Sequence, residues 1–246
     1  MEKNTLLLVI VAALSGLIGG FLLANSMNRS EMNALRSQAV APASNSVQQP
    51  GKPADDTLSP AEIQSKIDEA DKNADNFAFQ KNLGIGLYRY AAMKQDEKTM
   101  VEAERILARA AKLDGKDFDV LVALGNAEFD IGFFKKENAG FEKARATYTK
   151  ALEIKPNDLD VQTDLGLTYF LTEPADNAKA AATLEKVIAA DPKHSRSMQF
   201  LVQSFTKLGR IADAEKALAK LKEIEPSNAQ LSELTSQLAN AKGGAK

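Results

Sequence analysis

Apolar and polar residues follow one another along most of this chain with the three- and four-residue spacing of amphipathic α-helices. Proline recurs where this spacing stops, as in Glu153-Ile154-Lys155-Pro156 and again in Glu223-Ile224-Glu225-Pro226. Proline ends a helix because it cannot donate a hydrogen bond to the preceding turn. Ala is abundant and Trp is absent. The pattern therefore predicts an all-α fold of short helices.

One set of residues returns at a fixed interval of 41 positions. Self-similarity at a period of 20–50 residues indicates a stack of identical units, none of which buries its apolar face alone. Arrays of this kind usually act by surface contact rather than by chemistry at one buried point. The recurring residues are the pairs Leu83-Gly84, Leu124-Gly125 and Leu165-Gly166, the alanines Ala103 and Ala144, and the aromatics Tyr88, Phe129 and Phe170.

These units resemble the tetratricopeptide repeat (TPR) family, and the resemblance covers residues 75–226. It implies an all-α solenoid of four TPR-like helix-turn-helix repeats, with units at 75–117, 118–158, 159–192 and 193–226. The matching residues are Leu83, Gly84, Ala103, Leu107 and Ala110 in the first unit; Leu124, Gly125, Ala144, Tyr148, Ala151, Leu152 and Pro156 in the second; Leu165, Gly166, Tyr169, Ala180, Leu184 and Pro192 in the third; and Met198, Leu201, Phe205, Gly209, Ala214, Leu218 and Pro226 in the fourth.

The chain departs from the family pattern in three respects. The characteristic Trp is replaced in every unit, by Gln80, Leu121, Gln162 and Met198 in turn. Glu128 stands where an aromatic residue is usual, so Phe129 is expected to take that role. The first two units each carry extra residues, near 93–100 and 134–140. About seven residues make two helical turns, so we expect longer hairpins there.

Residues 5–24 read TLLLVIVAALSGLIGGFLLA, a run of twenty uncharged residues. At 1.5 Å per residue such a run spans a hydrocarbon core of about 30 Å. We expect residues 1–30 to be an uncleaved transmembrane anchor that contacts the lipid bilayer. A cleaved signal peptide is the alternative, because Ala24-Asn25-Ser26 resembles a small-x-small cleavage site.

Ala12, Gly16, Gly20 and Ala24 are spaced by four and would form a stripe of small residues on that helix. Such a stripe allows helix association in the membrane, and hence a homo-oligomer, although Gly and Ala are also common in membrane helices. Arg29 and Arg36 favour a cytoplasmic repeat domain under the positive-inside rule. By analogy with similar bacterial proteins, we expect the repeats outside the cytoplasmic membrane, on the periplasmic side.

Three further segments complete the predicted organisation. Residues 31–57 form a Pro-, Ala-, Ser- and Gln-rich linker whose composition predicts a disordered tether. Residues 58–74 predict a lead-in helix, in which Ser59, Pro60 and Glu62 form the start and a capping box. Residues 227–246 predict a capping helix begun by Ser227, with Leu231, Leu234 and Leu238 on one face and a tail.

Composition limits the chemistry. The chain has 246 residues, a net charge of −2, no cysteine and one histidine, His194, which we expect to be exposed. The charge gives no broad positive field, so no nucleic-acid partner is expected. Without thiolates or further histidines, we expect no metal site and no cofactor. No nucleophile stands beside a base, so we expect no enzymatic activity.

The resemblance implies that the first helices of successive units line a concave groove for a protein or peptide segment. An aromatic row of Tyr88, Phe129 and Phe170 would lie there, flanked by charges. The alternative is that the aromatics are inter-repeat core and the charges a solvated face. The chaperone-tail clamp of some members is not reproduced, because Val122 and Thr163 occupy its places. The groove candidates are Lys81, Asn82, Ile85, Tyr88, Arg89, Asp119, Val122, Asn126, Phe129, Asp130, Asp160, Thr163, Asp164, Leu167, Phe170, Arg196, Gln199, Gln203 and Lys207.

The sequence thus predicts a membrane-anchored TPR adaptor or scaffold that captures a partner segment in its groove and aids complex assembly at the membrane. One alternative is an assembly factor similar to the membrane-anchored repeat proteins of c-type cytochrome maturation, holding an apoprotein. A second alternative is a self-assembling structural oligomer without a client.

Overall fold

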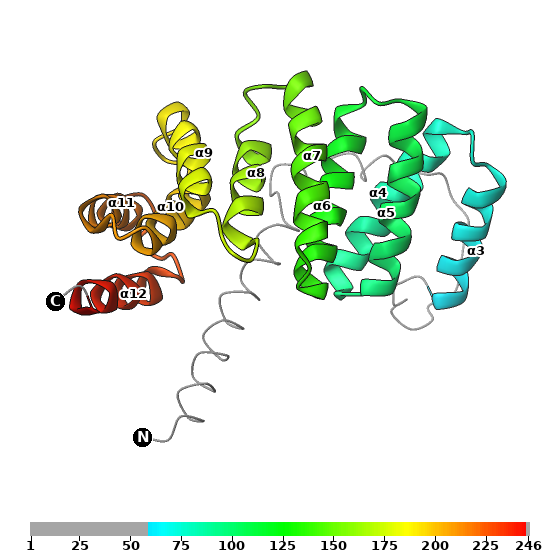
Figure 1. The fold of residues 1–246 in the computed structure, drawn as a ribbon. Coiled ribbons are helices and arrows are strands. Elements are labelled where there is room, and N and C mark those ends of the chain that lie inside the picture. Colours follow the sequence, from blue (N-terminus) through cyan, green and yellow to red (C-terminus); the bar gives the residue numbers. More distant parts are fainter. Residues whose placement is uncertain (1–58, 245–246) are drawn as a thin grey trace, which may run out of the picture.

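The computed structural model describes residues 59–244, and in this part of the chain every regular element is an α-helix (Figure 1). The predicted anchor, its small-residue stripe and the linker lie outside the described residues. Among the described helices, none is both long enough and apolar enough to cross a membrane. The helices are α3 (Pro60–Lys72), α4 (Phe77–Lys94), α5 (Glu97–Leu113), α6 (Phe118–Lys135), α7 (Asn138–Ile154), α8 (Leu159–Leu171), α9 (Asn177–Ala190), α10 (Ser195–Lys207), α11 (Ile211–Ile224) and α12 (Leu231–Gly244).

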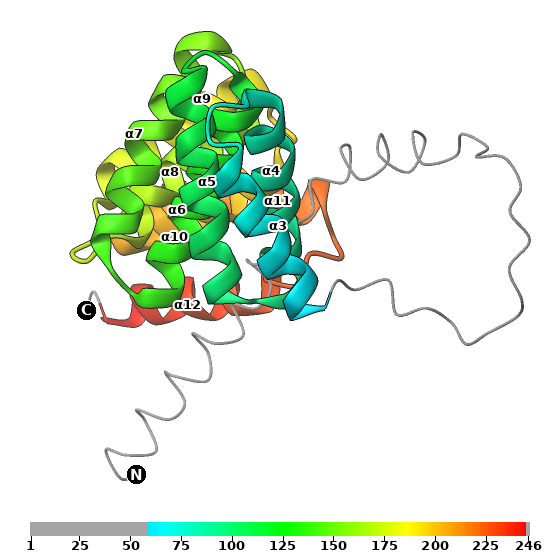
Figure 2. The same cartoon turned by 90° about the vertical axis from the view of Figure 1, so that its right-hand side faces the viewer.

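The helices form two layers. The first helices of the units, α4, α6, α8 and α10, pack successively against one another, and α12 continues their row. Each second helix, α5, α7, α9 or α11, packs against its own first helix and against the next one along. Figures 1 and 2 show that the array turns after α8, so that α10 and α11 are rotated relative to the upright α4–α8. This arrangement confirms the predicted all-α solenoid.

The first two hairpins are longer than the last two, as the extra residues predicted. Helices α4 and α6 have 18 residues and α5 and α7 have 17, whereas α8 and α10 have 13 and α9 and α11 have 14. Gln95 and Lys136 end α4 and α6 in the left-handed conformation, each with φ of 54°. The following helix then begins within two residues, so both hairpins turn tightly.

Small residues allow the two helices of a hairpin to approach. A Cβ added at Gly125 would lie 2.6 Å from Cε1 of Tyr148. Near the tip of the second hairpin, a Cβ at Gly140 would lie 2.3 Å from Cα of Gly132, so the two backbones touch there. Ala103, Ala144, Ala180 and Ala214 recur in the second helices and are all fully buried. The predicted crossing points are therefore confirmed.

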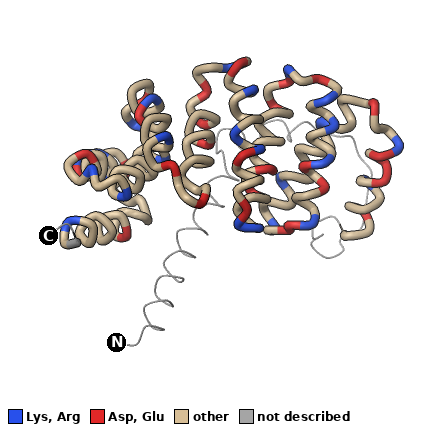
Figure 3. The backbone as a smooth tube through the Cα atoms, viewed as in Figure 1, with Lys and Arg blue, Asp and Glu red and all other residues tan. Residues whose placement is uncertain are grey.

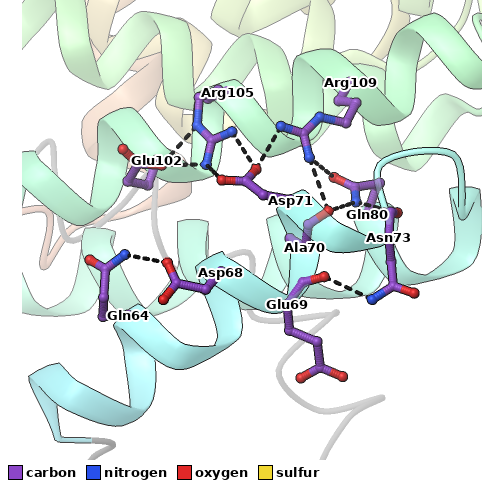
Figure 4. Close-up of polar contacts among 10 residues, drawn as sticks. All are labelled: Gln64, Asp68, Glu69, Ala70, Asp71, Asn73, Gln80, Glu102, Arg105 and Arg109. Carbon is purple, nitrogen blue, oxygen red and sulfur yellow. Dashed lines mark hydrogen bonds and ion pairs between the residues drawn. The ribbon is translucent and has the colours of Figure 1, made fainter.

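Helix α3 is fastened to the first unit through its C-terminal turn (Figure 4). The buried Gln80 donates from Nε2 to the carbonyl oxygens of Ala70 and Asn73, at 2.7 and 2.8 Å. Arg105 and Arg109 of α5 both bind the Asp71 carboxylate, at 2.6 and 2.8 Å. The glutamine thus gives the carbonyl groups of Ala70 and Asn73 a further donor besides the backbone N–H groups of Asn73 and Asn76. Gln80, in the place of the family's Trp, thus connects α3 to α4.

Both terminal helices were predicted, and one start was wrong. The capping box of Ser59 and Glu62 is present at α3, and Ile63, Ile67 and Ala70 are buried. Helix α12 buries Leu234 and Leu238, as expected, but it begins at Leu231 rather than after Ser227. The intervening residues form a turn in which Asn228 donates from Nδ2 to the Glu225 carboxylate, at 2.7 Å. Because of this turn, the helix begins later in the sequence than predicted.

Candidate functional site

The candidate site is the face made by the first helices, which we call the first-helix face. It comprises the groove candidates on α4, α6, α8 and α10. Figure 3 marks the positions of the charged residues along the backbone. On these helices the charges are grouped by sign: α4 and α10 carry only Lys and Arg, α8 carries only Asp, and α6 carries three acidic residues and one Lys. Five candidates, Asn82, Arg89, Asp119, Asp160 and Lys207, are exposed; Lys81, Ile85, Val122, Asn126, Phe170, Arg196 and Gln199 are half-buried; and Tyr88, Phe129, Asp130, Thr163, Asp164, Leu167 and Gln203 are buried.

The prediction that Tyr88, Phe129 and Phe170 form an accessible row of aromatic side chains is wrong. Tyr88 is 6% exposed and Phe129 is 1% exposed, so both belong to the core between repeats. Phe129 packs edge-on against Phe141 of α7, with ring centroids 5.3 Å apart. Phe170 alone is half-buried, and it packs edge-on against Phe200 of α10 at 5.7 Å. The physical reason is that a large apolar ring gains more from covering the neighbouring helix than from facing water.

Ion pairs between neighbouring first helices hold some of the charged side chains of this face. Lys81 of α4 binds Asp117, the N-cap of α6, at 2.7 Å and Asp119 at 3.1 Å. Burial opposes the lysine's charge, but the hydrogen bonds to Asp117 and Asp119 outweigh it and raise the pKa of Lys81. The lysine therefore stays charged and bridges the first two repeats.

The next two repeats are joined in a similar way. The Arg196 guanidinium of α10 binds the buried carboxylate of Asp164 on α8. Burial raises the pKa of Asp164, and the nearby Arg196 charge opposes that rise. Beside this pair, the hydroxyl groups of Thr163 and Ser197 are 2.7 Å apart and buried. Buried pairs of this kind fix geometry, because breaking one leaves an uncompensated charge.

His194 was expected to be exposed, and this is wrong. Its side chain is 16% exposed and its Nε2 lies 3.4 Å from Asp160. Its Nδ1 accepts a hydrogen bond from the backbone of Ser197, so the histidine is the N-cap of α10. The turn after Pro192 therefore directs the ring back towards α8, where it forms a third link between first helices. Ser, Thr, Asp and Asn are the usual N-caps, so the residue type gave little sign of this role.

Two tyrosine hydroxyl groups are anchored beneath the first-helix face. Tyr88 donates to Asp130 at 3.3 Å, and Tyr148 of α7 donates to Asn126 at 2.7 Å. Burial, together with the negative charge of Asp130, raises the pKa of Tyr88. Both tyrosines therefore stay neutral donors. They orient Asp130 and Asn126, two predicted site residues.

Glu128 is a buried carboxyl group on α6, outside the predicted site. It is 7% exposed and accepts a hydrogen bond of 2.7 Å from the Thr147 hydroxyl of α7. Burial raises its pKa to about 7, and the nearby charge of Glu104 adds to the rise while Thr147, Lys143 and Lys150 oppose it. The sequence marked Glu128 by its departure from the family's aromatic, and Phe129 does fill the core beside it.

Comparison with known proteins agrees with this architecture. The chain matches the tetratricopeptide repeat family over residues 129–158 and 171–238. Among solved structures it is similar to the MamA protein, with 22% identity and a TM-score of 0.53 over 69% of this chain and 84% of that one. It is also similar to TTC0263, a thermophilic TPR protein of Thermus thermophilus, with 17% identity and a TM-score of 0.50 over 74% of this chain and 89% of that one.

The family matches confirm the resemblance to TPR proteins. The structural likenesses, at these identities, establish the shared fold. Repeats and fold together are those of a protein-interaction scaffold.

Proposed function

We propose that this chain is a membrane-anchored adaptor that holds a segment of a partner protein on its first-helix face and aids complex assembly at the bilayer. Residues 5–24 would fasten it to the membrane, with the repeats on the periplasmic side. Catalysis has no part in this proposal. The apolar run at the N-terminus supports the anchor, and the repeat architecture supports the scaffold.

The observation that carries the proposal is the set of polar links between neighbouring first helices, one between α4 and α6 and two between α8 and α10. Lys81 joins α4 to α6, and the pairs Asp160–His194 and Asp164–Arg196 join α8 to α10. Polar groups held in place in this way lose little conformational entropy when a partner binds. Rim charges mainly set the association rate and the choice of partner, so a partner of complementary charge is favoured.

The solvent-facing members of the face would make the contacts. Asp119 and Asp160 occupy the same position of successive repeats and have side-chain exposures of 64% and 57%. Lys81 of α4 and Arg196 of α10 lie on either side of these two acidic residues along the array. The partner segment is therefore expected to present basic side chains opposite α6 and α8.

The proposal is tested by charge reversal on this face alone. Partners are recovered from native membranes with the full chain and with an Asp119→Lys/Asp160→Lys variant. The matched control is Glu142→Lys/Glu153→Lys, which changes the same charge at exposed positions of α7. We expect the first variant to lose the partner by about tenfold and the control to retain it.

Equal recovery with both variants would refute use of the first-helix face. Recovery of the chain itself as the sole product would instead favour the self-assembling oligomer.

A further inference from the structure

Exposed negative charge is concentrated on the two middle helices of the first-helix face. Helices α6 and α8 together carry five acidic residues, of which only Asp119 and Asp160 are exposed. The helices on either side, α4 and α10, carry only lysine and arginine as charged residues. A positively charged segment is therefore attracted to α6 and α8 and repelled by the helices beside them.

Both exposed carboxylates leave room for another cation. Lys81 binds one oxygen of Asp119 at 3.1 Å, and His194 lies 3.4 Å from one oxygen of Asp160. A carboxylate has about four acceptor positions on its two oxygens. The side chains of Asp119 and Asp160 are 64% and 57% exposed, so a second donor can approach each of them from solvent.

The spacing of these two carboxylates matches two turns of an α-helix. Asp119 and Asp160 are one repeat interval of 41 residues apart, on neighbouring first helices. Helices that pack side by side lie about 8–10 Å apart. Seven residues of an α-helix, two turns, span about 10 Å. A helical segment that lies across α6 and α8 would therefore bind both carboxylates through basic residues seven positions apart.

The chain itself contains such a pair of basic residues. Arg29 and Arg36 are seven positions apart, in the stretch between the predicted anchor and α3, outside the described residues. In a helix the two arginines would share one face with Met32, whereas Glu31 would point about 200° away from Arg29. The basic face of this segment thus complements the charge of α6 and α8, and its one acidic residue would face solvent.

The connection to the described domain is long enough for this contact. Residues 37–58 connect Arg36 to the start of α3, and these 22 residues can span at most about 75 Å. Helices α3, α4, α6 and α8 pack successively, so α8 lies three steps of about 8–10 Å from α3. Attachment to the same chain gives the segment a millimolar local concentration, so a weak contact suffices.

We propose that residues 29–36 bind across α6 and α8 of the same chain, with Arg29 and Arg36 on the carboxylates of Asp119 and Asp160, and that a partner segment must displace them. The inference rests on the proposed function of the first-helix face and adds how access to that face is regulated. Bound in this way, the segment next to the anchor keeps the face close to the bilayer and closed to weak partners.

Distances between two spin labels test the proposal in the full chain. The chain has no cysteine, so Ala34→Cys and Asn82→Cys place one label on the segment and one at an exposed position of α4. In a helix, Ala34 points about 140° away from Arg29, so its label does not enter the contact. Pulsed electron paramagnetic resonance then measures the distance distribution in lipid nanodiscs that hold one chain each.

We expect a narrow distribution from the wild-type background and a broad one after Arg29→Asp/Arg36→Asp. The variant Asp119→Lys/Asp160→Lys should broaden it as well, and the two pairs of changes combined should restore the narrow distribution, because the charges are then exchanged. Two controls should leave it narrow: Lys52→Glu in the linker and Glu142→Lys/Glu153→Lys on α7. Recovery of partner from native membranes should rise about threefold with Arg29→Asp/Arg36→Asp, as expected if about two thirds of the wild-type faces are occupied.

Three results would overturn the proposal: a broad distribution from the wild-type background, a narrow one that survives loss of both arginines, or no restoration by the exchanged charges. A segment supplied by a second copy would give the first of these, because each disc holds one chain. The proposed function is judged separately. Narrow, charge-dependent distances without any recovered partner would refute the adaptor and leave the internal contact standing, whereas broad distances with a recovered partner would do the reverse.

Discussion

Replacing Glu128 with glutamine should remove the fall in the free energy of unfolding that this residue causes as pH rises. The carboxyl group is buried on α6, and its one described hydrogen-bond partner is the Thr147 hydroxyl. Burial is the largest cause of its raised pKa, about 7 in the folded protein against an ordinary value of 4.5. Glutamine keeps the size of the side chain and a hydrogen bond to Thr147, and it carries no charge to desolvate.

The sign of the effect follows from proton binding. Between pH 4.5 and 7 the folded protein retains a proton at Glu128 that the unfolded chain has released, so the free energy of unfolding falls as pH rises through this window. The difference of about 2.5 pH units corresponds to about 3 kcal/mol, at about 1.36 kcal/mol per unit. That stabilisation is fully present below pH 4.5 and lost above pH 7.

Urea unfolding followed by circular dichroism measures this difference. We expect Glu128→Gln and the wild type to have similar midpoints near pH 4.5, and the variant to be more stable by about 2–3 kcal/mol at pH 8. Glu142→Gln, at an exposed position of α7, is the control and should leave the pH profile unchanged. A stability difference between variant and wild type that is the same at both pH values would refute the reasoning.

Three further predictions concern packing and the terminal helix. Gly140→Ala places a Cβ 2.3 Å from Cα of Gly132 and should destabilise the protein by about 3 kcal/mol. Gly86→Ala, in open space on α4, should instead stabilise it by about 0.5–1 kcal/mol. Thermal unfolding measures both changes, and equal effects of the two variants would contradict the close approach of the two backbones at Gly140. Tyr148→Phe removes the bond to Asn126 and should cost about 1 kcal/mol in urea unfolding, so an unchanged midpoint would show that the bond contributes nothing. Arg105 and Arg109 lower the pKa of Asp71 to about 2, so the stability that these ion pairs contribute is present above pH 3.8 and is lost as pH falls through 2. Asp71→Asn should therefore speed amide hydrogen exchange in α3 at pH 7 and leave exchange in α10–α12 unchanged. Unaltered exchange in α3 would contradict the role of Asp71 in holding this helix.

Local patterns made the architecture predictable. Gly125 and its counterparts at the same interval mark where two helices touch, and Ser59 with Glu62 marks where one begins. The extra residues in the first two units lengthen α4–α7 because two helical turns can be added without changing the phase of the apolar face. Each of these signals depends on residues close together in the sequence.

The surface was harder to predict, because exposure depends on the neighbouring repeat. Tyr88 and Phe129 have the same spacing as Phe170, yet the first two are covered by the core between repeats and the third is half-buried. The link from His194 to Asp160 needs the turn after Pro192. A cavity of about 580 Å³ beside Met198, Leu201 and Phe205 of α10 likewise needs α9 and α11 to lie apart. The repeat pattern of the sequence specifies neither the path of that turn nor the separation of those two helices.

Photo-crosslinking in native membranes tests the central claim most directly. A photoreactive amino acid is placed at Asn82, Asp160 or Lys207, all exposed on the first-helix face, and for comparison at Glu142 or Glu153 of α7. We expect one discrete partner to be crosslinked from the three first-helix positions and from neither position of α7. Identical products from both faces, or none from the first-helix face, would contradict a partner segment held there.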